Sequence, residues 1–258
     1  MSSMLIALLV AVSPVCPPQK LPAGRFAPGE ILSFKLDALG ADVGTFEIRT
    51  ALPPSSRKGA AFELSSRART SAFISTNVAR YEAYATALLS PDFAALSYRE
   101  DVDEGDTHRG TEVQFPPAAD GKLAVTATRN GEPEPIALQA NADAREILSS
   151  LFIFRAQPLK EGTPVCLEVF AGRKIWKVTG QAAARESIDT PMGRFSSMRV
   201  DSEAVRVDDP QVKRTAHVWV SDDPRRLPLV AVGEVRGKVI RATLVSSSGA
   251  RGRLTQRK

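Results

Sequence analysis

The sequence is poor in the residues that most metal sites and nucleophilic active sites use. Its 258 residues include only two cysteines, Cys16 and Cys166, and two histidines, His108 and His217. This count excludes metal sites of the CxxC or Cys/His type, and it forces any Ser-His-Asp site to use one of the two histidines. We therefore predict no metal site and no catalytic residue.

Motifs that bind nucleotides or activate a serine are also absent. The chain has no phosphate-binding glycine loop, no dinucleotide fingerprint and no Gly-x-Ser-x-Gly motif. We expect no cofactor. Charged residues make up 24% of the chain and the formal net charge is +5, but the basic residues are scattered and form no dense stripe. Because a nucleic-acid surface normally needs such a stripe, we expect no nucleic-acid partner.

The first 24 residues predict export. An uncharged apolar run, Met4–Val12, has the length of a signal-peptide core and is too short to span a bilayer as a helix. A Pro-rich linker follows it. We expect a protein of the periplasm or cell envelope, and a buried N-terminal strand is the alternative interpretation of this run.

The two cysteines receive different interpretations. Cys16 follows the apolar run at the place of a lipoprotein cysteine, but Ser13, Pro14 and Val15 depart from a lipobox, so we do not expect a lipid anchor there. If processing removed Cys16, no disulfide would remain within the chain. Cys166 lies in the alternating segment "TPVCLEVF", which predicts a small buried hydrophobic residue.

The body of the chain, residues 25–247, reads as a single β-rich domain. Apolar and polar residues alternate along many short segments, beginning with "ILSFKLDA" (31–38) and "VGTFEIRTAL" (43–52), and turn residues separate them. So many strands cannot stay flat. We predict an all-β, mainly antiparallel fold, with one long curled sheet in the form of a half-barrel or β-spiral. We expect a monomer.

One segment predicts a helix near 143–155, inserted against the concave face of the sheet. Asp143 is the expected N-cap and Glu146 follows three positions later, while Pro158 and Gly162 end the element. Apolar residues recur between them at helical spacing. They are Ile147, Leu148, Leu151, Phe152 and Phe154.

From Phe26 to Leu244 the chain resembles a bacterial envelope family, domain of unknown function 3108. The order and spacing of several short motifs carry the resemblance, among them "PGE" before the first strand, "LSSLFIFR" on the helix, "TPMGRF" and the hairpin that ends in "WVSDDPRRLP". The resemblance implies a secreted or periplasmic β-rich protein with no established catalytic residues. The family-like structural positions are Gly29, Glu30, Gly44, Leu148, Ser149, Arg155, Gly162, Pro191, Gly193, Phe195, Trp219, Asp222 and Pro228.

The resemblance and the expected shape together suggest an apolar groove. Curled sheets around a helix are similar in outline to periplasmic lipoprotein carriers, and we predict that Phe152, Phe154, Trp176 and Trp219 line the mouth of the groove. The leading hypothesis is an exported, non-enzymatic binding module or scaffold for a lipid, a peptide or another envelope protein. Packing within the core is the alternative for these aromatics.

Two chemistry-like segments have simpler interpretations. The acidic stretch from Asp101 to Glu112 is similar to a calcium loop, but its flanks look like strands, so a solvated hairpin tip is expected. The segment from His217 onward alternates as a strand, turns at "DDPRR" and returns with Pro228 at an edge or a bulge. An envelope hydrolase using His217 with Asp222 or Asp223 remains an alternative function, and so does a purely structural role in envelope assembly.

The basic tail, residues 248–258, has two interpretations as well. Its cations would be solvated in one of them. In the other they would make a peripheral contact with an anionic membrane. The cluster consists of Arg251, Arg253, Arg257 and Lys258.

Overall fold

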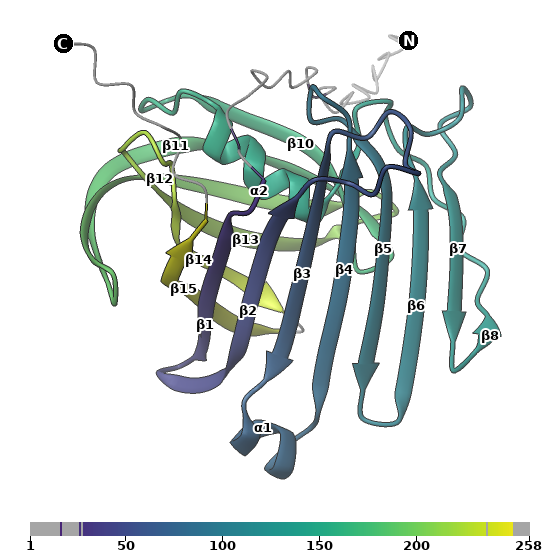
Figure 1. The fold of residues 1–258 in the computed structure, drawn as a ribbon, viewed down its shortest axis with the longest axis horizontal. Helices are drawn as coiled ribbons and strands as arrows, with labels where there is room; N and C mark the ends of the chain where they lie inside the picture. The colour runs from purple at the N-terminus through teal and green to yellow at the C-terminus, as the bar shows by residue number, and fades with distance from the viewer. Residues whose placement is uncertain (1–15, 17–25, 27, 236, 250–258) are drawn as a thin grey trace, which may run out of the picture.

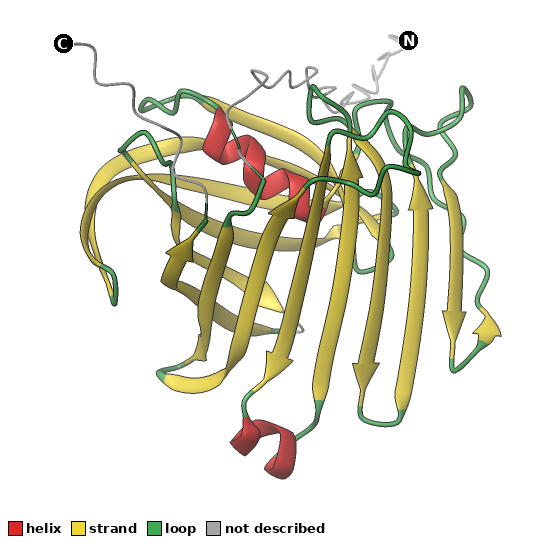
Figure 2. Cartoon of the chain, in the orientation of Figure 1, coloured by secondary structure: helices red, strands yellow, loops and turns green. Residues whose placement is uncertain are grey.

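A computed structural model describes residues 16, 26, 28–235 and 237–249. The predicted apolar segment, most of the linker and the four basic residues of the tail lie outside the described residues. Within them the chain forms one sheet of 15 strands and two helices. The sheet is open, because its edge strands, β8 and β9, do not pair with each other. This confirms the predicted all-β fold with one long curled sheet (Figures 1 and 2).

The first half of the chain forms a meander whose strands lie in sequence order. The elements are β1 (Ile31–Ala38), β2 (Ala41–Ala51), β3 (Phe62–Thr70), α1 (Ala72–Asn77), β4 (Tyr81–Leu89), β5 (Ala95–Glu104), β6 (Thr107–Gln114), β7 (Ala124–Arg129) and β8 (Glu132–Pro133).

The second half starts at the opposite edge of the sheet and returns toward the middle. Its elements are β9 (Arg145–Glu146), α2 (Ile147–Ala156), β10 (Pro164–Ala171), β11 (Lys174–Thr190), β12 (Gly193–Arg206), β13 (Asp209–Ser221), β14 (Pro228–Val235) and β15 (Lys238–Ser248).

The two halves meet where the first strand pairs with the last. β15 runs antiparallel to β1 from Asp37 opposite Arg241 to Ile31 opposite Ser248. The pairing of β9 with β10 is parallel, whereas the other strand pairs are antiparallel. In Figure 1 the strands β10–β13 pass behind β1–β6 and across their direction, so the single sheet curls back over itself.

The inner face of the sheet follows the alternation in the sequence. In β4 the side chains of Ala83, Ala85, Ala87 and Leu89 are buried, and those between them are more exposed. This period of two is typical of a strand with one face in the core. Small alanine side chains here leave room for the larger residues of the second half.

α2 fills the space between the two halves. Phe152 and Ile153 are fully buried, and the Phe152 ring packs against Phe26 at 5.0 Å and Phe93 at 6.1 Å between centroids. Aromatic pairs at such distances add to the burial of their apolar surface. Figure 1 shows the helix across one end of the sheet, between β1–β4 and β10, as the sequence predicted.

The start of this helix differs from the prediction. Glu146, not Asp143, is the N-cap, and its carboxylate accepts hydrogen bonds from the backbone N–H groups of Leu148 and Ser149. Arg145 and Glu146 instead pair with β10 as the short strand β9, so the chain is still extended where the sequence predicted helix. The N-cap is therefore acidic, as predicted, but it lies three residues later than the predicted Asp143.

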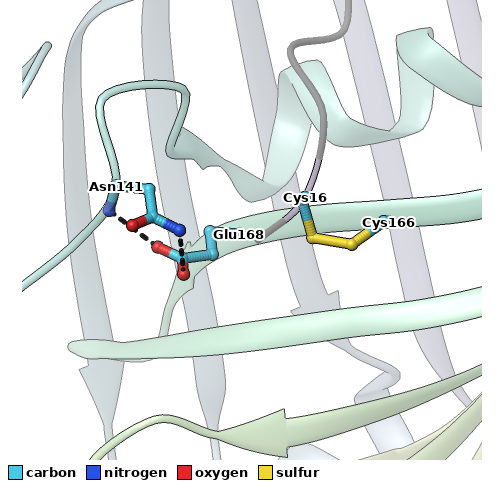
Figure 3. The surroundings of a disulfide bond; sticks show 4 residues. All are labelled: Cys16, Asn141, Cys166 and Glu168. Carbon is cyan, nitrogen blue, oxygen red and sulfur yellow. Dashed lines mark hydrogen bonds between the residues drawn. A yellow bond between two sulfur atoms is a disulfide. The ribbon is translucent and has the colours of Figure 1, made fainter. Parts of the chain in front are cut away.

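Cys166 was predicted as a buried hydrophobic residue, and this is wrong. Val165 and Leu167 face the core, while Cys166 lies on the opposite face of β10 and forms a disulfide with Cys16. On the same face, Glu168 accepts hydrogen bonds from the backbone and side chain of Asn141 at 2.8 and 2.6 Å (Figure 3). β10 therefore holds two preceding parts of the chain on its outer face.

Candidate functional site

Family-like residues from distant parts of the sequence meet at the C-terminal end of α2. Arg155, whose exposed fraction is 1%, donates hydrogen bonds from Nη1 and Nη2 to the two carboxylate oxygens of Glu30 at 2.6 and 2.7 Å. A buried bidentate pair of this kind fixes both position and orientation. It joins the start of β1 to the end of the helix.

The same guanidinium also reaches the turn between β13 and β14. Its Nε donates to the carbonyl oxygen of Arg226 at 2.9 Å and its Nη2 to that of Arg225 at 3.3 Å. The central guanidinium carbon, Cζ, lies 4.9 Å from the ring centroid of Phe26 and 4.9 Å from that of Phe152. Arg155 thus makes four hydrogen bonds to neighbours within the protein and holds three segments together.

Carboxylates of the "DDPRR" turn are also engaged. Asp222 pairs with Arg185 of β11 and lies 3.7 Å from Nη1 of Arg226. Asp223 accepts hydrogen bonds from the backbone and side chain of Arg225 and from the Ser221 hydroxyl. Burial acts to raise the pKa of Asp223, but the hydrogen bonds from Arg225 outweigh it and lower that pKa.

Three other family-like positions, Pro228, Phe195 and Gly44, lie in strands of the sheet. Pro228 lies at a register shift between β13 and β14, which confirms the predicted bulge. The Arg225 guanidinium lies 5.6 Å above the Phe195 ring. At Gly44 an added Cβ would overlap the carbonyl oxygen of Arg69, so only glycine fits that crossing.

The remaining family-like positions shape turns and the helix. Gly29, Gly162 and Gly193 have positive φ angles, which glycine adopts without strain, and Pro191 lies in the turn that Gly193 closes. Leu148 is buried in the core. The Ser149 hydroxyl donates to the carbonyl oxygen of Glu146.

His217 lies in a row of charged groups on the outer face of β11–β13. Its Nδ1 is 2.6 Å from Oδ1 of Asp201, and the indole N–H of Trp219 donates to Glu186 at 2.7 Å. Arg199 lies between these carboxylates and pairs with both. The carboxylate that the structure places beside His217 is thus Asp201 of the neighbouring strand, whereas the alternative of an envelope hydrolase named Asp222 or Asp223.

Most of the four aromatics assigned to a groove lie in or against the core. Phe152 and Phe154 are buried in the core around α2. Trp219 lies opposite Arg199 of β12 and donates its indole N–H to Glu186, and its partly buried ring also packs against the core cluster. Trp176 is buried outside that core cluster, under Arg214 at 4.8 Å. Three of the four side chains thus belong to the core or pack against it, as the alternative interpretation of core packing expects, and the groove mouth stays a prediction.

An ionisable cluster missed in the sequence lies between the two halves of the sheet. Arg173, in the turn between β10 and β11, donates to Thr111 at 2.9 Å and to two backbone carbonyls of β6 and β7. Glu100 lies near it on β5. Burial raises the pKa of Glu100, although a hydrogen bond from Tyr98 and the positive charge of Arg109 act to lower it. Alternation of Tyr98, Glu100 and Val102 could have placed this carboxylate on the inner face.

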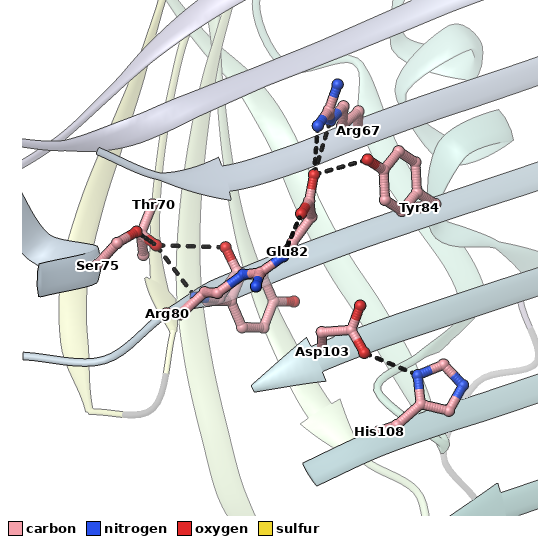
Figure 4. A network of polar contacts seen from close by, with 9 residues as sticks. Arg67, Thr70, Ser75, Arg80, Glu82, Tyr84, Asp103 and His108 are labelled. Carbon is pink, nitrogen blue, oxygen red and sulfur yellow. Dashed lines mark hydrogen bonds and ion pairs between the residues drawn. The ribbon is translucent and has the colours of Figure 1, made fainter. Parts of the chain in front are cut away.

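The outer face of β3–β6 carries a second polar network (Figure 4). Glu82 accepts hydrogen bonds from the Tyr84 hydroxyl at 2.6 Å and from Arg67 at 2.5 Å, and these lower the pKa of Glu82 to about 2.

His108, in the acidic stretch, is exposed, with Nδ1 2.8 Å from Asp103. Both flanks of the acidic stretch are strands, β5 and β6, as the hairpin interpretation predicted. Among the described residues, no three His, Cys, Asp or Glu side chains group as metal ligands.

Comparisons with known proteins agree with the fold. A family model described as "Protein of unknown function (DUF3108)" matches residues 32–244. None of the curated proteins matches the chain in sequence. The solved structure of a β-barrel-like protein of DUF1849 from Brucella abortus is similar, with a TM-score of 0.57 and 11% identity over 87% of this chain and 98% of that one. This likeness shows the fold alone.

Two further solved structures are more distant. One is a candidate exported protein with a YmcC-like fold from Bacteroides fragilis, with a TM-score of 0.36 and 8% identity over 90% of this chain and 100% of that one. The other is a candidate lipoprotein from Parabacteroides distasonis, with a TM-score of 0.35 and 9% identity over 90% of this chain and 97% of that one. Both TM-scores are too low to support a conclusion about this chain.

Proposed function

The chain belongs to the DUF3108 family of proteins of unknown function, and on that premise we propose that it is an exported, non-enzymatic module of the cell envelope that binds a lipidic or peptidic partner. The observation that carries the proposal is that the charged residues at the family-like positions, and Asp223 beside them, form ion pairs within the protein. Arg155 and Glu30 satisfy each other in a buried pair, and Asp222 and Asp223 are held by arginines. These ion pairs support a role of the family-like charged residues in holding the fold together rather than in catalysis.

Export is supported by two independent features. The apolar run Met4–Val12 has the length of a signal-peptide core. The disulfide between Cys16 and Cys166 is a bond that persists in the periplasm or outside the cell and is rare in the cytosol. The disulfide also uses the Cys16 sulfur that a lipid anchor would need, which favours a protein that reaches its partner without acylation at this residue.

Native mass spectrometry of the protein purified from the envelope fraction tests the proposal. We expect a lipid or peptide that co-purifies and is released on denaturation, and His217→Ala should retain it, because His217 lies in an outer-face network. Absence of any bound species would overturn the proposal. Hydrolysis of ester or amide substrates that is lost in His217→Ala would overturn it in favour of the hydrolase alternative.

A further inference from the structure

One arginine bridges the two edge regions of the curled sheet. β7 lies next to one edge strand and β10 next to the other, and no backbone pairing joins them in the part of the chain that the structure describes. Arg173, in the turn between β10 and β11, spans the gap. Its Nε donates to the Thr111 hydroxyl at 2.9 Å, and its Nη2 donates to the carbonyl oxygens of Gly110 and Thr128 at 2.8 and 2.7 Å. We call this contact region the seam.

An ion pair and one aromatic contact complete the seam. The carboxylate of Glu134, which follows β8, pairs with Nη1 of Arg173. Each of the three guanidinium nitrogens thus has an acceptor, and the side chain of Arg173 is only 11% exposed. Between β5 and β10 the rings of Tyr98 and Phe170 meet at 5.8 Å between centroids. Side chains rather than a backbone ladder therefore hold these two regions together.

The opposite side of the curl is closed in a different way. There β1 pairs with β15 from Ile31 opposite Ser248 to Asp37 opposite Arg241, and it also pairs with β2. Separating these strands would break a row of backbone hydrogen bonds, whereas parting the seam leaves every backbone ladder of the sheet intact. If the curl opens without unfolding, the seam is therefore the side that parts and the β1–β15 pairing is the side that stays.

Arg173 is an unusual residue for its own turn. Gly172 and Arg173 have φ angles of 57° and 64° and connect the paired residues Ala171 and Lys174, the geometry of a two-residue hairpin turn that favours Asn-Gly. A long side chain is strained at a positive φ. The hydrogen bonds of the guanidinium across the seam offset this strain. Arginine at this position thus serves the contact between the two edge regions and not the turn itself.

We propose that the curled sheet opens at the seam and that Arg173 is the clasp that holds it closed. Opening separates the β10–β11 turn from β6 and β7 while β1 and β15 stay paired. It exposes inner-face side chains beside the seam, such as Thr111 and Ala127, which are 3% and 6% exposed in the closed form. The inference goes beyond the proposed function, because the motion belongs to the fold and takes place with no partner bound.

The rate at which a maleimide labels a buried thiol measures the opening. Ala127→Cys places a thiol beside the seam, opposite Thr111 in the β6–β7 pairing. Ala87→Cys places one on β4, away from the seam, where Ala87 is 1% exposed. The two native cysteines are joined in a disulfide and do not react without reductant. We expect the thiol at position 127 to react faster than the one at position 87, and with a weaker dependence on denaturant, since opening exposes less surface than unfolding.

Removing the clasp should accelerate labelling at position 127. Arg173→Asn suits the turn, because Asn adopts a positive φ more readily than Arg, and it removes the hydrogen bonds across the seam. Loss of one such charged hydrogen bond is enough for an increase of about tenfold. Glu134→Gln removes only the ion pair and should accelerate labelling less. Leu39→Asn is the matched control, because Leu39 has a φ of 53° in the β1–β2 turn and is fully exposed; it should leave the rate at position 127 unchanged.

A variant that weakens the core separates opening from unfolding. Ile48, on β2, is 1% exposed, and Ile48→Val destabilises the folded sheet without touching the seam. It should accelerate labelling at position 87 by about two- to tenfold, because that thiol is reached only by unfolding. Labelling at position 127 should stay unchanged, because the seam opens before the core around Ile48 is lost.

Equal rates and equal denaturant dependence at positions 127 and 87 would mean that the inner face is reached only by unfolding, and would overturn the proposal. The same follows if Arg173→Asn does not accelerate labelling at position 127. Should Arg173→Asn fail to fold, Glu134→Gln makes the same comparison, and a rate equal to that of Leu39→Asn would overturn the clasp. None of these results depends on a bound lipid or peptide, so the proposed function stands or falls separately.

Discussion

Glu30 and Arg155 are 125 positions apart in the chain and form a two-bond ion pair in the interior, at 2.6 and 2.7 Å. Each lies in a different short motif that resembles the DUF3108 family. Arg155 extends the contact to the turn that precedes β14. One side chain therefore fixes the beginning of the sheet, the end of the inserted helix and a turn near the end of the chain.

Removing this guanidinium should destabilise the protein strongly. Arg155→Met leaves the Glu30 carboxylate without its partner in a largely buried place, and we expect a loss of about 3–5 kcal/mol in the free energy of unfolding. Denaturant unfolding followed by circular dichroism measures it. Arg225→Met is the matched control, since the side chain of Arg225 is 58% exposed, and should change stability by at most about 1 kcal/mol. Equal losses in both variants would contradict a special role for Arg155.

The disulfide should be present in the exported protein. Without reductant, neither Cys16 nor Cys166 should react with a maleimide, and after reduction and unfolding both should react. Peptide mass spectrometry under non-reducing conditions should find the two cysteines in one linked species. Replacing Cys166 with Ser should lower stability, by about 5 kcal/mol as an upper bound for so long a loop. A mature chain without Cys16, or with an acyl group on it, would contradict this pairing.

Glu82 should stabilise the protein only above acidic pH. Hydrogen bonds from Tyr84 and Arg67 lower its pKa from the ordinary value of 4.5 to about 2 in the folded state. The folded state therefore binds fewer protons than the unfolded state between these values, and stability is lost as the pH falls through them. The melting temperature of the wild type should exceed that of Glu82→Gln at pH 7, and the gap should close as the pH approaches 2. A gap independent of pH would contradict this.

Glu100 should show the opposite dependence. Burial raises its pKa above the ordinary 4.5, so the folded state binds more protons there and stability falls as the pH rises from 4.5 through the raised value. Glu100→Gln removes that penalty. Its melting temperature relative to the wild type should increase with pH and level off once Glu100 is fully ionised. If the melting temperature of Glu100→Gln relative to the wild type fell as the pH rises, Tyr98 and Arg109 would outweigh burial in setting the pKa of Glu100.

Local patterns in the sequence predicted the strands well. Alternation of apolar residues gave the segment "ILSFKLDA" as a strand, and the structure has β1 over the same residues, Ile31–Ala38. It also predicted a strand from His217 onward, and these residues lie in β13. Alternation does not say which face is inner, however. Trp219 was assigned to the mouth of a groove, whereas in the structure its ring packs against the core and its indole N–H donates to Glu186.

Contacts between residues far apart in the chain could not be predicted from such local patterns. Glu30 and Arg155 were both singled out, yet nothing in either motif indicated that they pair. Asp143 and Glu146 both fit a helix start, and the choice between them depended on β9, whose pairing with β10 is a tertiary contact. Cys16 was considered for removal or acylation because it follows the apolar run, and no local pattern points to its disulfide partner 150 positions away.

The pairing of β1 with β15 has a consequence for the order in which the protein can fold. Residues 31–37 find their partners at 241–248, so the centre of the sheet stays incomplete until nearly the whole chain is available. Loop closure over such a separation slows folding, since its entropy is lost before the contact stabilises the chain. A chain that emerges with its N-terminus first exposes an unpaired edge of β1 until the last strand arrives. Folding of this protein is therefore expected to be a late, post-synthetic event that benefits from a chaperone.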